Sequence, residues 1–112
     1  MTGTVATYPI SITSPYIALA SPIFAQLTGT GPDLVRQSSS HPHQVVMHRD
    51  RPELLVPDLG ADITWRFAKD DMGLWNLNGQ IQYTPGSGPR HIALHGMPGT
   101  LVPLAELISP LR

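Results

Sequence analysis

The stretch Asp62-Ile63-Thr64-Trp65-Arg66-Phe67-Ala68-Lys69 decides the fold class of this chain. Apolar and polar residues alternate along it, so that Ile63, Trp65 and Phe67 share one face and the polar residues share the other. Successive side chains of a β-strand point to opposite faces. Strict alternation therefore predicts a half-buried strand whose apolar face carries the large Trp65 ring into the core.

Two turn signals follow this strand. Residues 70–73 (Asp-Asp-Met-Gly) combine aspartates, whose side chains bond their own backbone, with a glycine that accepts positive φ. Residues 78–79 (Asn-Gly) form a hairpin signal. Alternation then resumes, and we expect Ile81 and Tyr83 to lie in the same core as Trp65.

Further short strands are expected on both sides of this region, because prolines limit the length of each element. Residues 103–108 are the one expected helix, with proline in its first turn. The strands recur at roughly ten-residue spacing, which predicts an all-β fold, a small sandwich or barrel of short antiparallel strands with one short C-terminal helix and an extended N-terminal segment. The additional strands cover residues 44–48, 53–56, 90–95 and 100–102. The expected core consists of Ile63, Trp65, Phe67, Ile81, Tyr83, Ile92 and Leu94.

The first 32 residues contain no Asp, Glu, Lys, Arg or His. Prolines interrupt the apolar run and no positive n-region precedes it, which argues against a signal peptide or a membrane span. Two interpretations remain open: residues 1–32 form edge strands of the same domain, or they form an extended arm that packs on neighbouring copies. We expect residues 1–112 to form a single domain with a β core over residues 33–112.

Composition excludes several classes of partner and site. Charged residues make up 13% of the 112 residues and the formal net charge is −1, so no basic field is present for nucleic acid or an anionic membrane. The chain has no cysteine, which excludes disulfides, thiolate metal sites and cysteine nucleophiles.

The chain has five histidines that are possible metal ligands: His41, His43, His48, His91 and His95. On a strand His41 and His43 would share a face and could chelate together, whereas His48 would point to the opposite face. His91 and His95 would lie about 13 Å apart, too far for one ion. We therefore expect no metal and no cofactor, with His41 and His43 as the weak candidates.

No motif for catalysis is recognised. Residues 38–40 are serines of a linker, and Gly86-Ser87-Gly88 lacks the spacing of a nucleophile elbow. Asp70 and Asp71 are a candidate carboxylate pair, but in a tight turn they are expected to be solvated. The sequence thus predicts no catalytic residue and a protein that is not an enzyme.

Aromatic side chains are the candidates for subunit contacts, because large aromatic anchors are enriched at interfaces. Trp75 is flanked by a turn and by a polar residue, which favours partial exposure. The interface candidates are Tyr8, Tyr16, Phe24 and Trp75.

Residues 60–107 resemble the small β modules of tailed-phage baseplate and tail proteins. The matching pieces are a strand ending in an aromatic (63–67), an acidic turn with glycine (70–73), an Asn-Leu-x-Gly segment (76–79) and a Gly-Thr-hydrophobic strand running into a Leu/Ala-rich helix (99–107). The resemblance implies a non-enzymatic, oligomeric protein attached to sister virion proteins through extended arms.

The first functional hypothesis is therefore a structural subunit, a bacteriophage virion component of the head, its decoration or the tail. It would form a homo-oligomer, contact other virion proteins through residues 1–32, and reside in the virion after assembly in the host cytoplasm. The alternative is a small β-barrel that binds a ligand or metal through His41 and His43. A third possibility is a small enzyme without a recognisable motif.

Overall fold

The computed structural model describes residues 3–94 and 101–105 and contains eight β-strands in this part of the chain. Every pair of neighbouring strands is antiparallel. The strands are β1 (Gly3–Thr7), β2 (Ile23–Leu27), β3 (Val46–Met47), β4 (Glu53–Asp58), β5 (Ile63–Lys69), β6 (Trp75–Gln82), β7 (Pro89–Leu94) and β8 (Leu101–Ala105).

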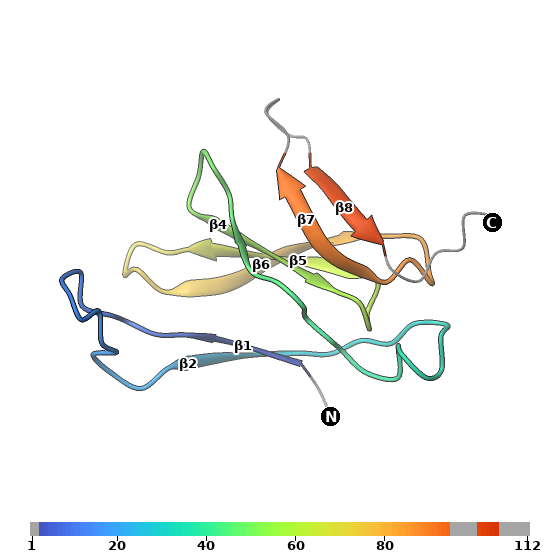
Figure 1. Cartoon of the computed structure of the whole chain (residues 1–112), viewed down its shortest axis with the longest axis horizontal. Coiled ribbons are helices and arrows are strands. Elements are labelled where there is room, and N and C mark those ends of the chain that lie inside the picture. The colour runs from blue at the N-terminus through green and yellow to red at the C-terminus, as the bar shows by residue number, and fades with distance from the viewer. Residues whose placement is uncertain (1–2, 95–100, 106–112) are drawn as a thin grey trace.

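The strands form three sheets. β3, β4, β5 and β6 make a four-stranded sheet in sequence order, while β1 pairs with β2 and β7 pairs with β8. Figure 1 shows the two small sheets on either side of the four-stranded sheet. β7 packs against β4. β4 is thus buried along its whole length and β5 over most of it, whereas β6 stays largely exposed.

One buried cluster joins β1 and β2 to the four-stranded sheet. Apolar side chains from β4 and β5 meet those of the first two strands, and Ala25 and Trp75 pack at its margin. Removing these side chains from water is the main favourable term of folding. The cluster consists of Val5, Leu27, Leu54, Val56, Ala61, Ile63, Trp65 and Phe67.

The predicted strand is confirmed over residues 63–69, with Asp62 in the turn before it, but its predicted polar face is not solvated. Asp62 is 3% exposed and Thr64 is fully buried, while Arg66 is partly buried. The expectation of a half-buried strand was wrong because β5 has a strand on each side and a small sheet over each face. Polar residues on such a strand require hydrogen-bond partners.

Two expected core residues lie on the other face of the sheet. Ile81 is opposite Thr64, and Trp65 is opposite Gln80. Directly opposed residues of an antiparallel pair share a face, so Ile81 does not share the core of Trp65. Tyr83 lies with Thr64 as well, because their hydroxyl groups are 2.8 Å apart.

The all-β, antiparallel class is confirmed, and its finer form is corrected. The described strands form three sheets in place of a closed barrel or a two-sheet sandwich. The predicted helix over residues 103–108 was wrong where it can be compared, because residues 103–105 belong to β8; residues 106–108 lie outside the described residues. Within residues 3–94 and 101–105 there is no helix long and apolar enough to cross a membrane.

The uncharged N-terminal segment contains β1 and β2, joined by a loop over residues 8–22. Val5 of β1 and Leu27 of β2 belong to the buried cluster. The division of the chain into one domain, with an arm or edge strands before residue 33, stays a prediction.

Candidate functional site

The connection between β4 and β5 carries two buried aspartates, Asp58 and Asp62, which are 0% and 3% exposed. Burying a carboxyl group is costly unless it is hydrogen-bonded. The side chain of Asp58 accepts five hydrogen bonds and that of Asp62 accepts three. This end of the four-stranded sheet therefore gathers donors from several segments of the chain.

Asp58 fixes the segment that carries His41. Its Oδ2 accepts from the Ser40 hydroxyl and, at 2.8 Å, from the indole N–H of Trp65. Its Oδ1 accepts from the backbone N–H of His41 at 2.7 Å and from two backbone N–H groups of the turn that follows. One carboxyl thus joins the core ring to the start of the histidine segment.

The same segment then runs beside the end of β4. The His43 backbone N–H donates to the Pro57 carbonyl at 3.1 Å, and the Leu59 N–H donates to the His41 carbonyl at 3.1 Å. These bonds hold residues 41–43 in an extended conformation that leads into β3. His41 and His43 are both exposed.

Asp62 fixes a second segment, the loop before β7. Its carboxyl accepts from the backbone N–H of Gly86 at 2.7 Å and of Gly88 at 2.8 Å. Asp62 has a positive φ of 57° and Gly88 one of 58°, a region that Asp tolerates better than most residues and that Gly adopts freely. The β4–β5 turn and the loop before β7 are therefore joined through one side chain.

Gln37 completes the arrangement from a third segment. It is fully buried, and its Nε2 donates to Asp62 Oδ1 at 2.7 Å and to the Leu59 carbonyl at 2.8 Å. Its Oε1 accepts from the Asp33 backbone N–H at 3.0 Å. The loop over residues 31–37 is thereby tied to the same turn.

Segments far apart in sequence meet where β7 begins. The backbone N–H of Ile92 donates to Gln44 Oε1 at 2.8 Å, across 48 residues of sequence. The β7–β8 register shifts between Pro89 and His91, so a bulge lies at Arg90. Bulges re-aim side chains, and Arg90 and His91 are consecutive residues that are both exposed.

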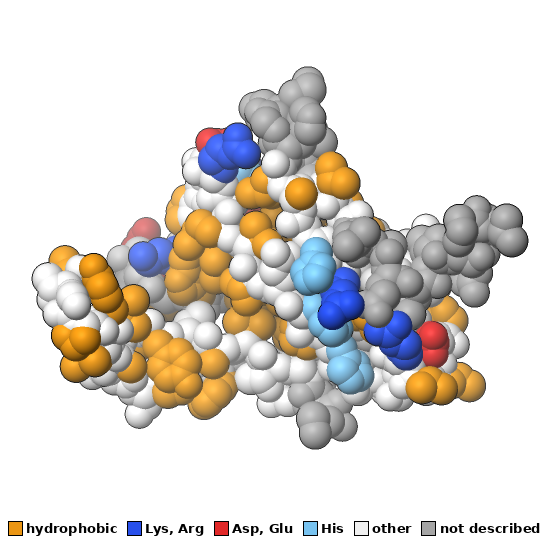
Figure 2. All heavy atoms as spheres, in the orientation of Figure 1, with side chains coloured by type: hydrophobic (Ala, Val, Ile, Leu, Met, Phe, Trp, Pro, Cys, Tyr) orange, Lys and Arg blue, Asp and Glu red, His pale blue; other side chains and the backbone are white. Residues whose placement is uncertain are grey.

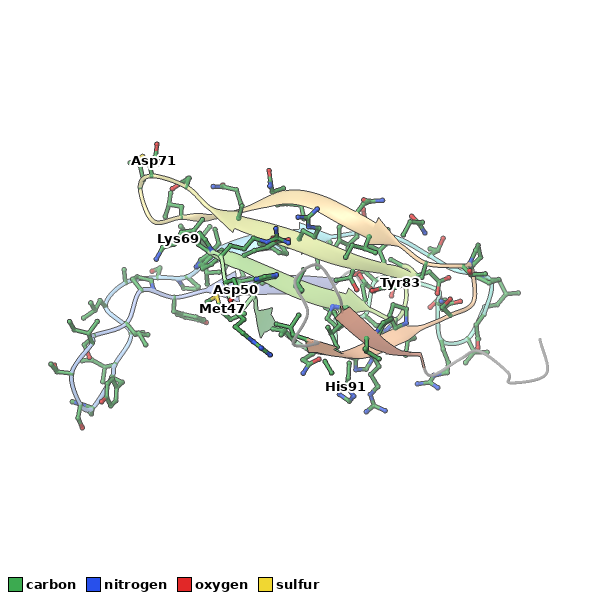
Figure 3. The ribbon with its side chains drawn as sticks, turned by 90° about the horizontal axis from the view of Figure 1, so that it is seen from above. Met47, Asp50, Lys69, Asp71, Tyr83 and His91 are labelled. Atoms are coloured by element: carbon green, nitrogen blue, oxygen red, sulfur yellow. The ribbon has the colours of Figure 1, made fainter. Side chains whose placement is uncertain are left out.

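We call the side chains of His41, His43, Arg90 and His91 the histidine face. Figure 2 shows histidine side chains in a column with Lys or Arg side chains beside them. In Figure 3, His91 points away from the four-stranded sheet, in the half that carries Tyr83, whereas Lys69 and Asp71 lie at the opposite end. The folded chain therefore brings together residues that the sequence separates into two groups.

The histidine face offers two kinds of chemistry. Imidazole titrates near neutral pH and is the commonest general acid or base in enzymes. Guanidinium stays charged and binds carboxylate or phosphate oxygens in a bidentate manner. The face is thus suited to an anionic substrate that undergoes proton transfer.

The metal alternative rests on His41 and His43. Among the residues that the structure describes, no three His, Cys, Asp or Glu side chains are arranged to hold a metal ion. His41 Nδ1 lies 2.7 Å from the Ser39 carbonyl oxygen. Metal binding by this pair stays a prediction, and His95 lies outside the described residues.

The other aspartate pair lies in the exposed β5–β6 turn. Asp70 Oδ1 accepts from the backbone N–H groups of Met72 and Leu74, both at 2.9 Å, and Oδ2 accepts from the Asn76 amide at 2.8 Å. The bond from Leu74, followed by that from Asn76, lowers the pKa of Asp70 below its ordinary value. These partners of Asp70 are all local, within six residues of it.

The interface candidates lie near the same end. Tyr8, Tyr16 and Phe24 are exposed, Phe24 by 66%, while Trp75 is partly buried with the Lys69 ammonium 5.8 Å from its ring centre. A cleft of about 350 Å³ lies between the loop after β1 and the β5–β6 turn, lined in part by Tyr8, Lys69 and Trp75. A subunit contact through these aromatics stays a prediction.

The sequence interpretation missed the residues that build the site. Asp58, Asp62, Gln37 and Arg90 were not candidates. The bonds that join Asp58 to His41 and Asp62 to Gln37, Gly86 and Gly88 span 17 to 26 residues, and no local spacing announces them. The available signal was the Asp58-Leu59-Gly60-Ala61-Asp62 connection, in which two aspartates and a glycine follow an apolar strand. Such a composition indicates a turn built on side-chain hydrogen bonds.

Comparison with known proteins identifies relatives of this chain. Residues 1–109 match the family described as Lactonase, 7-bladed beta-propeller. The chain is 35% identical over 79 residues to the 6-phosphogluconolactonase of Bacillus subtilis (strain 168), covering 70% of this chain and 22% of that protein.

Two solved structures are also similar. A crystal structure from Bacteroides fragilis NCTC 9343, described as a candidate 6-phosphogluconolactonase, superposes with a TM-score of 0.77 at 28% identity and covers 92% of this chain and 31% of that one. A protein from Lactobacillus plantarum gives a TM-score of 0.64 at 27% identity, covering 80% of this chain and 25% of that one. The chain spans about a fifth of the length of the curated relatives it matches.

These matches overturn the phage interpretation. The resemblance of residues 60–107 to tail modules was wrong, as were the expected virion location, the virion partners and the protein without enzymatic activity. A strand, an acidic turn, a second strand and a loop occur in any antiparallel meander, so the quoted pieces described the sheet and not a phage family.

Proposed function

The chain belongs to the lactonase family of seven-bladed β-propellers, and on this premise we propose that it forms part of an enzyme that hydrolyses 6-phosphogluconolactone. The observation that carries the proposal is the hydrogen bond from the Ile92 N–H to Gln44 Oε1, which brings the two halves of the histidine face together. The reaction needs a proton acceptor and an anion-binding group, and this face offers both.

The three sheets fit the architecture of a propeller. A blade is a four-stranded antiparallel sheet, and blades surround a central channel. We assign β3–β6 as one whole blade, β1–β2 as two strands of the preceding blade and β7–β8 as the first two strands of the next. Seven blades hold about 28 strands, so these eight strands are about two sevenths, in agreement with the 22% and 31% of relatives that the chain covers.

This assignment gives the histidine face its location. β3 is the first strand of its blade and β7 the first strand of the next, and first strands line the channel when a blade is built outward in sequence order. His43 precedes β3 directly, and Arg90 and His91 lie in β7. The face therefore lies where two adjacent blades meet the channel.

The chemistry follows from the side chains. Water adds to the lactone carbonyl carbon while an imidazole of the histidine face takes its proton, and the ring C–O bond then breaks. The same imidazole returns the proton to the leaving ring oxygen, so that an open-chain hydroxy acid is released. Arg90 binds the phosphate of the substrate, since guanidinium pairs with phosphate through two parallel hydrogen bonds.

The test is the rate of lactone hydrolysis by the purified protein that carries these residues. We expect hydrolysis of 6-phosphogluconolactone above the uncatalysed rate, with gluconolactone lacking the phosphate as a poorer substrate. Replacing His43 or His91 by Ala should lower kcat by about 10²-fold or more for whichever acts as the base. Arg90→Ala should raise KM for the phosphorylated substrate far more than for the other.

His48→Ala is the matched control, because His48 lies at the far end of β3 and its ring accepts only a local bond from the Asp50 N–H. It should leave both constants unchanged. Hydrolysis no faster than in buffer, or equal losses for His48→Ala and both site histidines, contradicts the proposal.

A further inference from the structure

Each half of the histidine face is held by its own buried carboxyl group. Asp58 accepts from the His41 backbone, and Asp62 accepts from two backbone N–H groups of the loop before Arg90. We propose that Asp62 is a positioning residue that sets the place of Arg90 and His91 relative to the His41 and His43 half. The inference rests on the proposed function for the nature of the substrate, but its structural part does not.

The Asp62 carboxyl accepts hydrogen bonds directly from the backbone of the loop before β7. One oxygen accepts the Gly86 N–H at 2.7 Å and the other accepts the Gly88 N–H at 2.8 Å, so the carboxyl spans the turn of the loop. Gly88 is followed by Pro89, whose φ is fixed by its ring, and then by Arg90. Little conformational freedom remains between the held amide and the guanidinium-bearing residue.

The carboxyl is itself immobilised from the opposite side. Gln37 donates to Asp62 and to the Leu59 carbonyl, and it is fully buried. The Asp62 carbonyl also accepts the Tyr83 N–H at 2.9 Å, at the start of the same loop. Asp62 thus holds the loop at its beginning through the backbone and at its middle through the side chain.

Separate control of the two halves distinguishes positioning from general stability. Asp58 contacts the first half through Ser40 and His41, whereas Asp62 contacts the loop before the second half through Gly86 and Gly88. A change at Asp62 should therefore displace His91 and leave His41 in place. General damage to the sheet would displace both.

Asp62→Asn is the variant of choice. Asn accepts the positive φ of this position as Asp does, so the backbone is not strained. If its Oδ1 keeps the bonds from Gln37 and Gly88, its Nδ2 faces the Gly86 N–H, and that bond is replaced by two opposed donors. Asp62→Gly, which also accepts this φ, serves where the Asn variant fails to fold.

Asp70→Asn is the matched control. Asp70 is also an aspartate of a turn whose carboxyl accepts three hydrogen bonds, but it follows the last residue of β5 whereas Asp62 precedes the first, and its partners are local. The two variants make the same change of charge and differ in whether the turn reaches the histidine face.

Two readouts test the inference. In protein with ¹³C-labelled histidine and no ligand, Asp62→Asn should shift the ring signals of His91 and leave those of His41 and His48 unchanged; the signals are assigned by replacing each histidine singly. In the lactone assay, we expect kcat/KM to fall about 10- to 100-fold, with the change in KM for the phosphorylated lactone at least as large as that in kcat. Asp70→Asn should change neither readout.

Equal shifts at His91 and His41, or unchanged His91 signals, overturn the inference. If the parent protein hydrolyses no lactone, the proposed function fails while the selective His91 shift still decides the positioning role. If the parent is active and Asp62→Asn keeps kcat/KM within twofold, the positioning role fails while the proposed function stands.

Discussion

An aspartate lies at each end of β5, and the two differ in which segments donate hydrogen bonds to them. At one end Asp62 accepts hydrogen bonds from Gln37, Gly86 and Gly88, which lie 24 to 26 residues away in sequence. At the other end Asp70 accepts three bonds from residues at most six positions away. Both are aspartates of turns that contain glycine, yet one end joins three segments and the other closes a hairpin.

Both residues are aspartates, so residue type does not explain the difference. What differs is the burial of the carboxyl group and the distance in sequence to its hydrogen-bond partners. A buried carboxyl must find donors, so each segment that supplies one is fixed at that place. An exposed carboxyl can exchange its partners for water at little cost. The segment of His41 and the loop before Arg90 are consequently held at the end of β5 where Asp62 lies.

The largest effect that tests this contrast is expected from Asp58→Ala. The change leaves the Ser40 hydroxyl, the Trp65 indole N–H and three backbone N–H groups without their acceptor. We expect a loss of about 3–5 kcal/mol in the free energy of unfolding, measured by chemical denaturation. Asp70→Ala should leave the denaturation midpoint almost unchanged; similar losses for both would remove the distinction between the two ends.

A second test uses the close approach of the backbones of Gly60 and Ser39, in the turn between β4 and β5 and in the segment before His41. A Cβ at Gly60 would lie 1.7 Å from the Ser39 carbonyl oxygen, so Gly60→Ala must push the histidine segment away. We expect a cost of about 2–3 kcal/mol in the same denaturation experiment.

Gly73→Ala is the control for this change. Its Cβ would meet nothing closer than the Lys69 Cε at 3.7 Å, and it tests only the positive φ of 82°. The expected cost is about 1 kcal/mol. An equal or smaller cost for Gly60→Ala would show that the backbones of Gly60 and Ser39 are not closely packed.

The smallest expected effect lies between the two ends, at Glu53 of β4. Its side chain is 9% exposed and pairs with Arg66 at 2.5 Å and with Arg51 at 2.7 Å. The hydrogen bond from Arg66, and then the charges of Arg66 and Arg51, lower the pKa of Glu53 below its ordinary value of 4.5, against the opposing effect of burial. A depressed carboxyl pKa stabilises the fold above the pKa of the unfolded state, and this contribution is lost as the pH falls through the folded value.

Glu53→Gln should therefore lower the free energy of unfolding at pH 7 by about 1 kcal/mol, a value kept small because Arg66 is 37% exposed to solvent. Below about pH 4.5 the difference from the parent protein should shrink. Denaturation curves at a series of pH values measure this, and a difference that grows toward acid would contradict the assigned ion pair.

The sequence predicted part of the local structure; the expected Asn78-Gly79 turn was wrong, because both residues lie within β6. Alternation located β5, and the Asp-Asp-Met-Gly turn that follows it was also recognised. The register shift between Arg66 and Phe67 could not be read, and it left Ile81 and Tyr83 on the face opposite to their predicted one. A bulge depends on the paired strand, so periodicity within one strand does not reveal it.

Function was misjudged for a related reason. The absence of charge over residues 1–32 was interpreted as edge strands of the domain or as an arm, and the virion hypothesis relied on this segment for its contacts. β1 and β2 instead pair with each other and contribute Val5 and Leu27 to the buried cluster of the fold. The histidines were noticed as His41 and His43, but their proximity to Arg90 depends on one bond across 48 residues.

Titration of ¹³C-histidine-labelled protein with 6-phosphogluconate, the product of the proposed reaction, tests the assignment of the site most directly. We expect saturable shifts of the His43 and His91 ring signals that are lost in Arg90→Ala, with the His48 signals unchanged. Shifts confined to His48, or no saturable shift at any histidine, would contradict the assignment of the site to the histidine face.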